Sequence, residues 1–152
     1  MFRFAIVVSR FNEEITEGLL RGAQEFFAER SIPSDAVKVF RVPGAFEIPL
    51  AAKRLGESGE FDAIVCLGCL IKGDTMHFEY IADATSHGIM RAAASTGLPM
   101  AFGVLTTDTW EQAEERAVDG QENKGWEAAA AAIEMAGMVR TLRTGDRVRT
   151  GR

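Results

Sequence analysis

The chain has 152 residues and 47% of them are hydrophobic, which suits one domain around a single core. Its formal net charge of −5 excludes a general nucleic-acid binder, because such a protein would normally carry a basic face. Residues 1–8 are apolar but too few to cross a bilayer, and they lack the form of a signal peptide. We therefore expect a cytoplasmic protein with no nucleic-acid or membrane partner.

Four short apolar runs predict the strands of a sheet. They lack polar alternation, which is typical of strands that are buried on both faces. In chain order the runs are Phe4 to Val8, Val37 to Val42, Ala63 to Leu67 and Met100 to Leu105.

Helices are predicted between and after these runs by the helical spacing of apolar residues. The first helix carries an apolar face made of Ile15, Leu19, Ala23, Phe26 and Phe27. The second and third span Ala45 to Leu55 and His77 to Thr96. The fourth opens at the capping box Thr109 to Gln112, and the fifth spans Lys124 to Leu142. Gly56 and Gly97 are the expected ends of the second and third helices.

The alternation of strands and helices predicts a parallel sheet with right-handed crossovers. We therefore expect a three-layer α/β/α sandwich of the flavodoxin type, with a four-stranded sheet and helices on both faces. In this prediction residues 1–142 form one domain, and 143–152 form a basic tail that frays. Ligands of such sheets bind beyond the carboxyl ends of the strands, so candidate functional residues are sought in the loops there.

Two of these loops carry a candidate each for ligand contact. Phe11 follows the first strand, and it either packs against the next helix as a staple or offers a stacking surface to a flat heterocycle. Its neighbour Asn12 can both donate and accept a hydrogen bond. Glu47 follows the second strand near a helix start, where it either compensates the helix dipole or accepts hydrogen bonds from a polyol.

The most informative loop follows the third strand and contains Gly73, Asp74, Thr75 and His77. These residues lead into a helix, whose free N–H groups and dipole form an anion site, and Thr75 adds a hydroxyl group. A histidine beside such a site is a candidate for proton transfer near neutral pH. We expect the other histidine, His87 in mid-helix, to be structural.

Cys66 and Cys69 form a C-x-x-C pair at the end of the third apolar run. Such a pair can serve redox chemistry or bind a metal, but the sequence has no second pair and no helix opens here, which favours buried thiols in a strand. Later in the chain Phe102 is expected to be buried, while Arg116 and Lys124 are cations that composition alone leaves unremarkable. Walker A and G-x-G-x-x-G patterns are missing, which disfavours nucleotide hydrolases and dinucleotide oxidoreductases.

Taken together, these segments resemble the 6,7-dimethyl-8-ribityllumazine synthase family. The matching pieces run in the family's order across nearly the whole chain: Ser9-Arg10-Phe11-Asn12, Val42-Pro43-Gly44-Ala45-Phe46-Glu47-Ile48-Pro49, Gly73-x-Thr75-x-His77-Phe78, Phe102-Gly103-Val104-Leu105-Thr106-Thr107, Glu111-Gln112-Ala113 with Glu115-Arg116-Ala117, and Asn123-Lys124-Gly125-Trp126-Glu127-Ala128-Ala129. The resemblance implies an enzyme that condenses 5-amino-6-(D-ribitylamino)uracil with 3,4-dihydroxy-2-butanone 4-phosphate, without a cofactor or metal. The products are 6,7-dimethyl-8-ribityllumazine, phosphate and water.

The resemblance also implies roles for single residues, with His77 as the group that transfers protons. Phe11, next to Asn12, would stack on the pyrimidine ring. The ribityl-uracil would further contact Ala45, Phe46 and Glu47 and the backbone of Cys69, Leu70 and Ile71. Asp74 and Thr75 would hold the phosphate. Phe102 and Arg116 would come from a neighbouring subunit, and Lys124 would lie near the site.

The family's basic unit is a homopentamer, and some members assemble into an icosahedral shell of about 60 subunits. The resemblance therefore implies a homo-oligomer, small-molecule substrates and riboflavin synthase as a candidate partner. Asp74 departs from the family pattern because its carboxylate stands beside the expected phosphate, so its side chain should point away or be paired. Gly120 stands where many shell-forming relatives carry Lys, which removes one cation near the site. The chain also begins directly at its first sheet strand, which bears on the higher assembly and not on the chemistry. The alternatives are a non-catalytic flavin or lumazine binder and an inactive shell protein.

Overall fold

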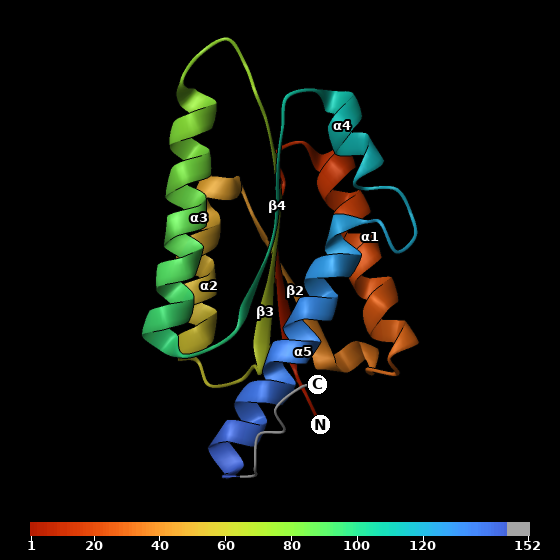
Figure 1. Ribbon diagram of the computed structural model, residues 1–152, viewed down its shortest axis with the longest axis vertical. Coiled ribbons are helices and arrows are strands. Elements are labelled where there is room, and N and C mark those ends of the chain that lie inside the picture. The colour runs from red at the N-terminus through yellow and green to blue at the C-terminus, as the bar shows by residue number, and fades with distance from the viewer. Residues whose placement is uncertain (146–152) are drawn as a thin grey trace, which may run out of the picture.

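A computed structural model describes residues 1–145 of the chain (Figure 1). Within that range the strands are β1 (Phe4–Ser9), β2 (Val37–Val42), β3 (Ala63–Ile71) and β4 (Met100–Thr107). The helices are α1 (Glu13–Glu29), α2 (Ile48–Glu57), α3 (His77–Thr96), α4 (Trp110–Glu115) and α5 (Lys124–Thr144), with short 3-10 turns η1 (Ser34–Ala36) before β2 and η2 (Ala45–Glu47) before α2.

The four strands form one parallel sheet in the order β2-β1-β3-β4. Helices α2 and α3 cover one face, and α1, α4 and α5 lie on the other (Figure 1). This arrangement confirms the predicted three-layer α/β/α sandwich of the flavodoxin type. Because every strand runs the same way, the carboxyl ends of all four meet at one edge of the sheet, where the loops with the candidate residues lie.

Two apolar cores lie on the two faces of the sheet, because side chains alternate along each strand. In β1, Phe4, Ile6 and Val8 pack into the core beneath α1 and α5, while Ala5 and Val7 pack into the core beneath α2 and α3. Phe4 stacks on Phe27 of α1, with ring centroids 4.6 Å apart. The central strands β1 and β3 are therefore buried on both faces, as predicted.

The same prediction of burial on both faces is wrong for β2 and β4. In β2, Lys38 and Arg41 are exposed, and in β4 Phe102 and Thr106 are exposed. Both strands lie at an edge of the sheet, where each pairs with a single strand and its outer side has no further strand to cover it.

Most helix boundaries agree with the predicted ones. Helix α3 spans His77–Thr96 and ends at Gly97, whose φ of 72° is the left-handed conformation that glycine adopts readily. The capping box of α4 is present, since the Gln112 backbone N–H donates to Thr109 Oγ1 at 3.1 Å. The predicted single helix over Ala45–Leu55 is instead a 3-10 turn followed by α2, in which Pro49 occupies the first turn.

Two predicted helix ends are wrong. Gly56 lies inside the last turn of α2 and does not end it; a β-carbon there would lie only 3.1 Å from Thr96, so the glycine permits close packing of α2 against the end of α3. Helix α5 continues to Thr144 and ends at Gly145, with φ 75°, two residues beyond the predicted Leu142. The rest of the predicted basic tail lies outside the described residues.

None of the helices within residues 1–145 combines the length and apolar character needed to span a membrane.

Candidate active site

The loop after β1 holds Phe11 and Asn12 in a defined geometry. Asn12 has φ 60° and ψ 51°, and its side-chain amide donates to the backbone carbonyl of Cys69 at 2.9 Å. The backbone N–H of Phe11 donates to the carbonyl of Pro43 at 3.1 Å, which links the loops that follow β1 and β2. The Phe11 ring is 63% exposed, which contradicts the staple interpretation and leaves its face free for a ligand.

The loop after β2 turns through Pro43 and Gly44 into the 3-10 turn η2. Glu47 Oε1 accepts a hydrogen bond from the backbone N–H of Gly44 at 2.9 Å. The carboxylate thus stabilises the turn through a direct hydrogen bond, which is neither of the two predicted roles. It also lines the pocket described below, so this role leaves Glu47 available to a ligand.

The loop after β3 begins later than predicted. Cys69, Leu70 and Ile71 belong to the strand itself, because β3 pairs with β4 as far as Ile71 opposite Thr107. Residues 72–76 then carry the chain to His77, the first residue of α3, whose backbone N–H donates to Thr75 Oγ1 at 3.3 Å. The Thr75 hydroxyl therefore lies at the start of a 20-residue helix, where an anion is favoured.

These three loops and α3 enclose a cavity of about 550 Å³, which we call the His77 pocket. It is lined by Phe11, Pro43, Gly44, Ala45, Phe46, Glu47, Leu70, Ile71, Gly73, Thr75, His77, Phe78 and Ile81. Its volume lies in the range of small-ligand sites, and most of its lining is apolar with a few polar groups. The structure therefore brings an aromatic face, a carboxylate, a helix start and an imidazole together around one cavity.

Three of the predicted site residues on this side do not line the pocket. Cys69 is buried and Asn12 bonds to its carbonyl, so both lie behind the lining. Asp74 is exposed and absent from the lining, although Gly73 and Thr75 on either side of it belong to it. The expectation that its carboxylate points away from the phosphate stays a prediction.

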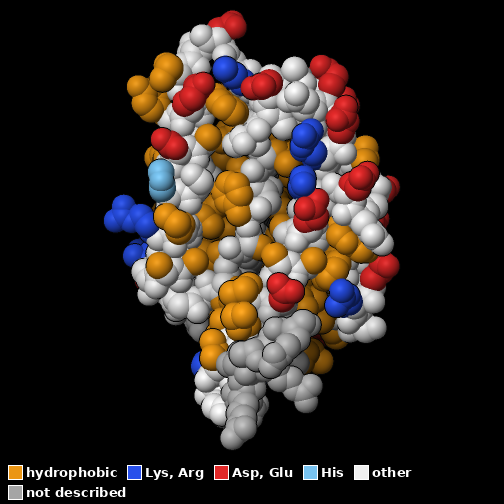
Figure 2. Space-filling model, viewed as in Figure 1, with side chains coloured by type: hydrophobic (Ala, Val, Ile, Leu, Met, Phe, Trp, Pro, Cys, Tyr) orange, Lys and Arg blue, Asp and Glu red, His pale blue; other side chains and the backbone are white. Residues whose placement is uncertain are grey.

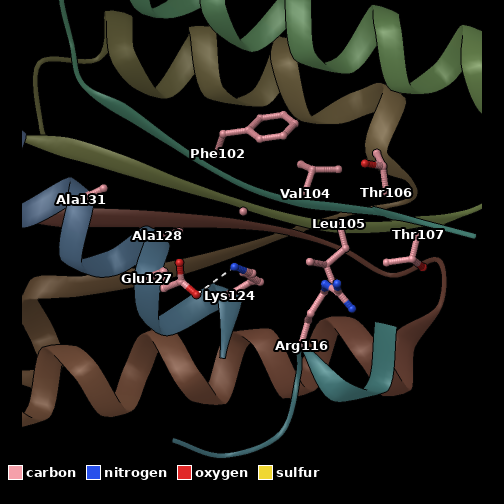
Figure 3. A pocket seen from close by; sticks show the side chains of 11 residues that line it. Phe102, Val104, Leu105, Thr106, Thr107, Arg116, Lys124, Glu127, Ala128 and Ala131 are labelled. Atoms are coloured by element: carbon pink, nitrogen blue, oxygen red, sulfur yellow. Dashed lines mark ion pairs between the residues drawn. The ribbon is translucent and has the colours of Figure 1, made fainter. Parts of the chain in front are cut away.

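A second hollow of about 450 Å³ follows the open edge of the sheet and is called the β4 groove (Figure 3). It is lined by Phe102, Gly103, Val104, Leu105, Thr106, Thr107, Arg116, Lys124, Glu127, Ala128 and Ala131. Phe102 lies on one side of β4, and Arg116 and Lys124 lie on the other, at the ends of α4 and α5 (Figure 3). Phe102 is 51% exposed, so the expectation that it is buried is wrong.

The two cations of the β4 groove are only partly neutralised. Arg116 donates from Nη1 to the carbonyl of Gln112 at 2.8 Å and lies 4.0 Å from the exposed carboxylate of Glu115. Lys124 pairs with Glu127 at 3.0 Å (Figure 3). Both cations keep 42% of their side-chain surface exposed, so an anion can reach them. Exposed pairs of this kind contribute little to stability.

The predicted site residues therefore form two groups on one chain. The His77 pocket and the β4 groove have no lining residue in common. The pocket lies on the α3 side of the sheet, and the cations of the groove lie on the α4 and α5 side.

Sequence reasoning overlooked two apolar positions of the His77 pocket and the buried Asn123. Phe78 appeared only as part of a motif, and Ile81 was not singled out, although both line the pocket. Their spacing of three residues on α3 is the helical signal that could have identified them. Asn123 is fully buried at the start of α5, and its residue type alone gives no sign of that burial.

The cysteines are buried thiols, as favoured from the sequence. Cys66 is in the core beneath α2 and α3, and Cys69 is in the core beneath α1 and α5, because residues three apart on a strand point to opposite faces. They therefore cannot pair with each other or share a metal. Burial raises the pKa of Cys66 to about 12 and the pKa of Cys69 to about 11. Within residues 1–145, no three His, Cys, Asp or Glu side chains are grouped to hold a metal ion.

The fold and the two hollows define a flavodoxin-like α/β protein with a ligand pocket at the carboxyl edge of its sheet. The sequence model of the family described as 6,7-dimethyl-8-ribityllumazine synthase matches residues 1–140. A protein of Syntrophus aciditrophicus (strain SB) that is named 6,7-dimethyl-8-ribityllumazine synthase is 51% identical over 140 residues, which cover 92% of this chain and 91% of that protein. The chain belongs to the 6,7-dimethyl-8-ribityllumazine synthase family, which confirms the resemblance seen in the motifs.

Proposed function

We propose that this chain condenses 5-amino-6-(D-ribitylamino)uracil with 3,4-dihydroxy-2-butanone 4-phosphate, and that His77 moves the protons of the reaction. Its family makes it a transferase of riboflavin biosynthesis. The observation that carries the assignment of His77 is its place in one cavity with the exposed ring of Phe11 and the start of α3. That cavity places an aromatic face, the start of a helix and an imidazole around one space.

The ribityl-uracil takes the part of the pocket between Phe11 and η2. The ring of Phe11 stacks on the pyrimidine, which the exposure of that ring supports. Ala45, Phe46 and Glu47 contact the polyol chain, and the free oxygen of Glu47 accepts its hydroxyl groups. Leu70 and Ile71 border the heterocycle, while Cys69 lies behind them and its carbonyl accepts the hydrogen bond from Asn12.

The phosphate of the second substrate binds at the start of α3. The backbone N–H groups of the first helical turn have no partner within the helix, and the helix dipole favours negative charge there. Thr75 adds its hydroxyl and Asp74 its backbone N–H, while the Asp74 carboxylate stays outside the lining. Arg116 and Lys124 are the cations suited to the outward side of the phosphate. Because they line the separate β4 groove on their own chain, the proposal supplies them from a neighbouring chain.

The reaction consists of steps that each move a proton. The amine of the ribityl-uracil attacks the ketone, and loss of water gives an imine. Removal of a proton next to the imine then expels phosphate, and ring closure with loss of a second water gives the lumazine. His77 serves as base and then as acid, which an imidazole can do near neutral pH. Holding two substrates in attack geometry supplies much of the rate, and the phosphate site steadies the leaving group.

A site shared between two chains explains why one chain has two separate hollows. Hydrophobic side chains gather down the middle of the face on which β4 lies (Figure 2). Phe102 is exposed on that edge, while Phe46, Leu50 and Tyr80 are exposed around η2, α2 and α3. Two different surfaces that fit each other make a head-to-tail contact, and repetition of that contact closes a ring. The homopentamer of the family is the ring we propose; a 60-subunit shell built from about twelve such rings is a further step of assembly.

We also propose that the protein works in the cytoplasm and that riboflavin synthase is its partner. Two free, buried cysteines suit a reducing compartment. The partnership is supported by chemistry alone, because the lumazine product is the precursor from which riboflavin is made.

The test is to mix the purified protein with both substrates and follow the absorbance and fluorescence of the lumazine, with each substrate alone as the control. The particle is sized in the same buffer. Lumazine formation that needs both substrates is the expected result, and its absence would overturn the proposal. Tight binding of lumazine or flavin without turnover would instead favour a non-catalytic binder, and assembly without binding would favour an inactive shell protein.

A further inference from the structure

Asn123 is a polar side chain with no exposed surface. Its Nδ2 donates to the carbonyl of Gly18 at 3.0 Å and to the carbonyl of Val118 at 2.9 Å. Its Oδ1 accepts from the backbone N–H of Gly125 at 2.7 Å and of Trp126 at 3.2 Å. Both amide hydrogens and the amide oxygen are thus used, and the side chain ties together α1, the segment 116–124 and the start of α5.

Three glycines allow α1, the segment 116–124 and the start of α5 to approach one another closely around this amide. A β-carbon on Gly22 of α1 would overlap the Asn123 amide, and one on Gly125 would overlap the carbonyl of Leu19. A β-carbon on Gly18 would lie 2.6 Å from the carbonyl oxygen of Ala117. Gly18 and Gly22 are one helical turn apart and form a notch on α1. We call Asn123 together with Gly18, Gly22 and Gly125 the Asn123 clamp.

The clamp holds the segment that carries both cations of the β4 groove. The backbone N–H of Lys124 donates to the carbonyl of Arg116 at 2.8 Å, which closes the segment into a loop. Between them Val118 and Gly120 are exposed, and Gly120 has φ 119°, a conformation that glycine adopts readily. Asn123 holds this loop at two points, since its amide donates to the carbonyl of Val118 within the loop and to the carbonyl of Gly18 on α1.

We propose that Asn123 is a positioning residue that sets Arg116 and Lys124 for the phosphate of the second substrate, with the glycine notch on α1 as its seat. The proposal rests on the proposed function. Asn123 touches no substrate itself, because it is buried and absent from the lining of either hollow. Loss of the Asn123 side chain should selectively weaken binding of the phosphate substrate, since the contacts to the ribityl-uracil lie in the His77 pocket.

The first variant is Asn123→Ser. Serine can still cap the N-terminus of α5, but its short side chain cannot reach the carbonyls of Gly18 and Val118. We expect KM for the phosphate substrate to rise at least about tenfold, with KM for the ribityl-uracil changed by less than about twofold. An equal change in both constants, or no change in either, would overturn the proposal.

The second variant is Gly22→Ala, with Gly137→Ala as its matched control. Both glycines lie inside helices, but a β-carbon on Gly137 of α5 meets nothing within 4 Å, whereas one on Gly22 displaces the Asn123 amide. Helix propensity alone would make both changes favourable. We expect Gly22→Ala to reproduce the selective rise in KM and Gly137→Ala to leave both constants unchanged. Equal behaviour of the two variants would contradict the role of the notch.

Amide hydrogen exchange separates this proposal from the proposed function. In the intact protein without substrates, exchange at the backbone N–H of Lys124 should speed up in Asn123→Ser and Gly22→Ala, because that N–H closes the loop onto Arg116. An unchanged exchange rate at Lys124 would contradict the role of the Asn123 clamp, whatever KM values the variants show. Faster exchange in a protein whose wild type forms no lumazine would retain the clamp and reject the substrate assignment.

Discussion

Asn12 and Cys69 are joined by a hydrogen bond of 2.9 Å, from the side-chain amide of the first to the backbone carbonyl of the second. The bond fastens the loop after β1 to the end of β3, and it depends on the left-handed backbone of Asn12, with φ 60°. Asn12→Gly removes the bond but keeps that backbone conformation free of strain, so it should lower the free energy of unfolding by about 1 kcal/mol. Asn12→Ala adds left-handed strain and should lower it by about 1–2 kcal/mol more.

Urea unfolding of the wild type and the two Asn12 variants measures these differences. The order wild type, glycine, alanine is the expected ranking of stability. Alanine equal to glycine would show that backbone strain plays no part at this position. Both variants should also raise KM for the ribityl-uracil, because Phe11 next to Asn12 then loses its fixed place in the pocket.

His77→Ala should lower kcat by about 10²–10⁴-fold while binding of the ribityl-uracil survives, because the imidazole is proposed to move protons and not to hold the heterocycle. His87→Ala is the control, since His87 is exposed on the same helix and lines neither hollow. Steady-state kinetics and direct binding of the ribityl-uracil give the two readouts. A His77→Ala enzyme with wild-type turnover would remove the histidine from the chemistry.

Arg116→Ala should raise KM for the phosphate substrate. A charged hydrogen bond contributes about 1.5–3 kcal/mol, which corresponds to a rise in KM of about 10–100-fold for that substrate. Arg116→Lys should recover only part of the loss, because an ammonium group does not reproduce the fork of the guanidinium. Arg54→Ala is the control, since Arg54 lies in the last turn of α2 and pairs with Glu57 at 3.4 Å. An unchanged KM in Arg116→Ala would exclude Arg116 from the site.

The sequence could indicate which residues meet around the His77 pocket because the signals for them are local. A parallel sheet collects ligand loops at the carboxyl ends of its strands, and the start of α3 at His77 and its end at Gly97 follow from the residues on either side. Phe11 and Glu47 needed only the order of strand, loop and helix to be placed at the same edge.

The features that sequence reasoning missed depend on elements far apart in the chain. Phe102 is exposed because β4 is an edge strand, and the order of strands cannot be read from the apolar content of one run. Gly56 lies inside α2 because it allows close contact with Thr96 of another helix, and a glycine in the sequence alone more readily predicts the end of a helix. Asn123 is buried because α1 approaches it closely. In the sequence, the spacing of Gly18 and Gly22 by one helical turn only weakly indicates this approach.

The buried thiols should make stability fall at alkaline pH. Burial raises the pKa of Cys66 to about 12 and of Cys69 to about 11, above the ordinary thiol value of 9.0. A thiol whose pKa is higher in the folded state favours folding fully below the unfolded pKa, and this contribution is lost as pH rises toward the folded value. Thiol alkylation should therefore be slow at neutral pH in the folded protein and fast in urea. Rapid labelling of the folded protein would contradict the burial of both cysteines.

Mixing two defective variants tests whether one site is built from two chains. Equal amounts of His77→Ala and Arg116→Ala chains are unfolded, mixed and refolded, and lumazine formation is measured below the wild-type KM for the phosphate substrate. In a head-to-tail ring, an intact site needs an Arg116→Ala chain to supply His77 and a His77→Ala chain to supply Arg116. Random assembly therefore restores about a quarter of the sites. If each chain held a whole site, every site would carry a defect and mixing would restore nothing. Mixing His77→Ala with a chain that carries both substitutions is the control, because no contact in that ring can contain an intact His77.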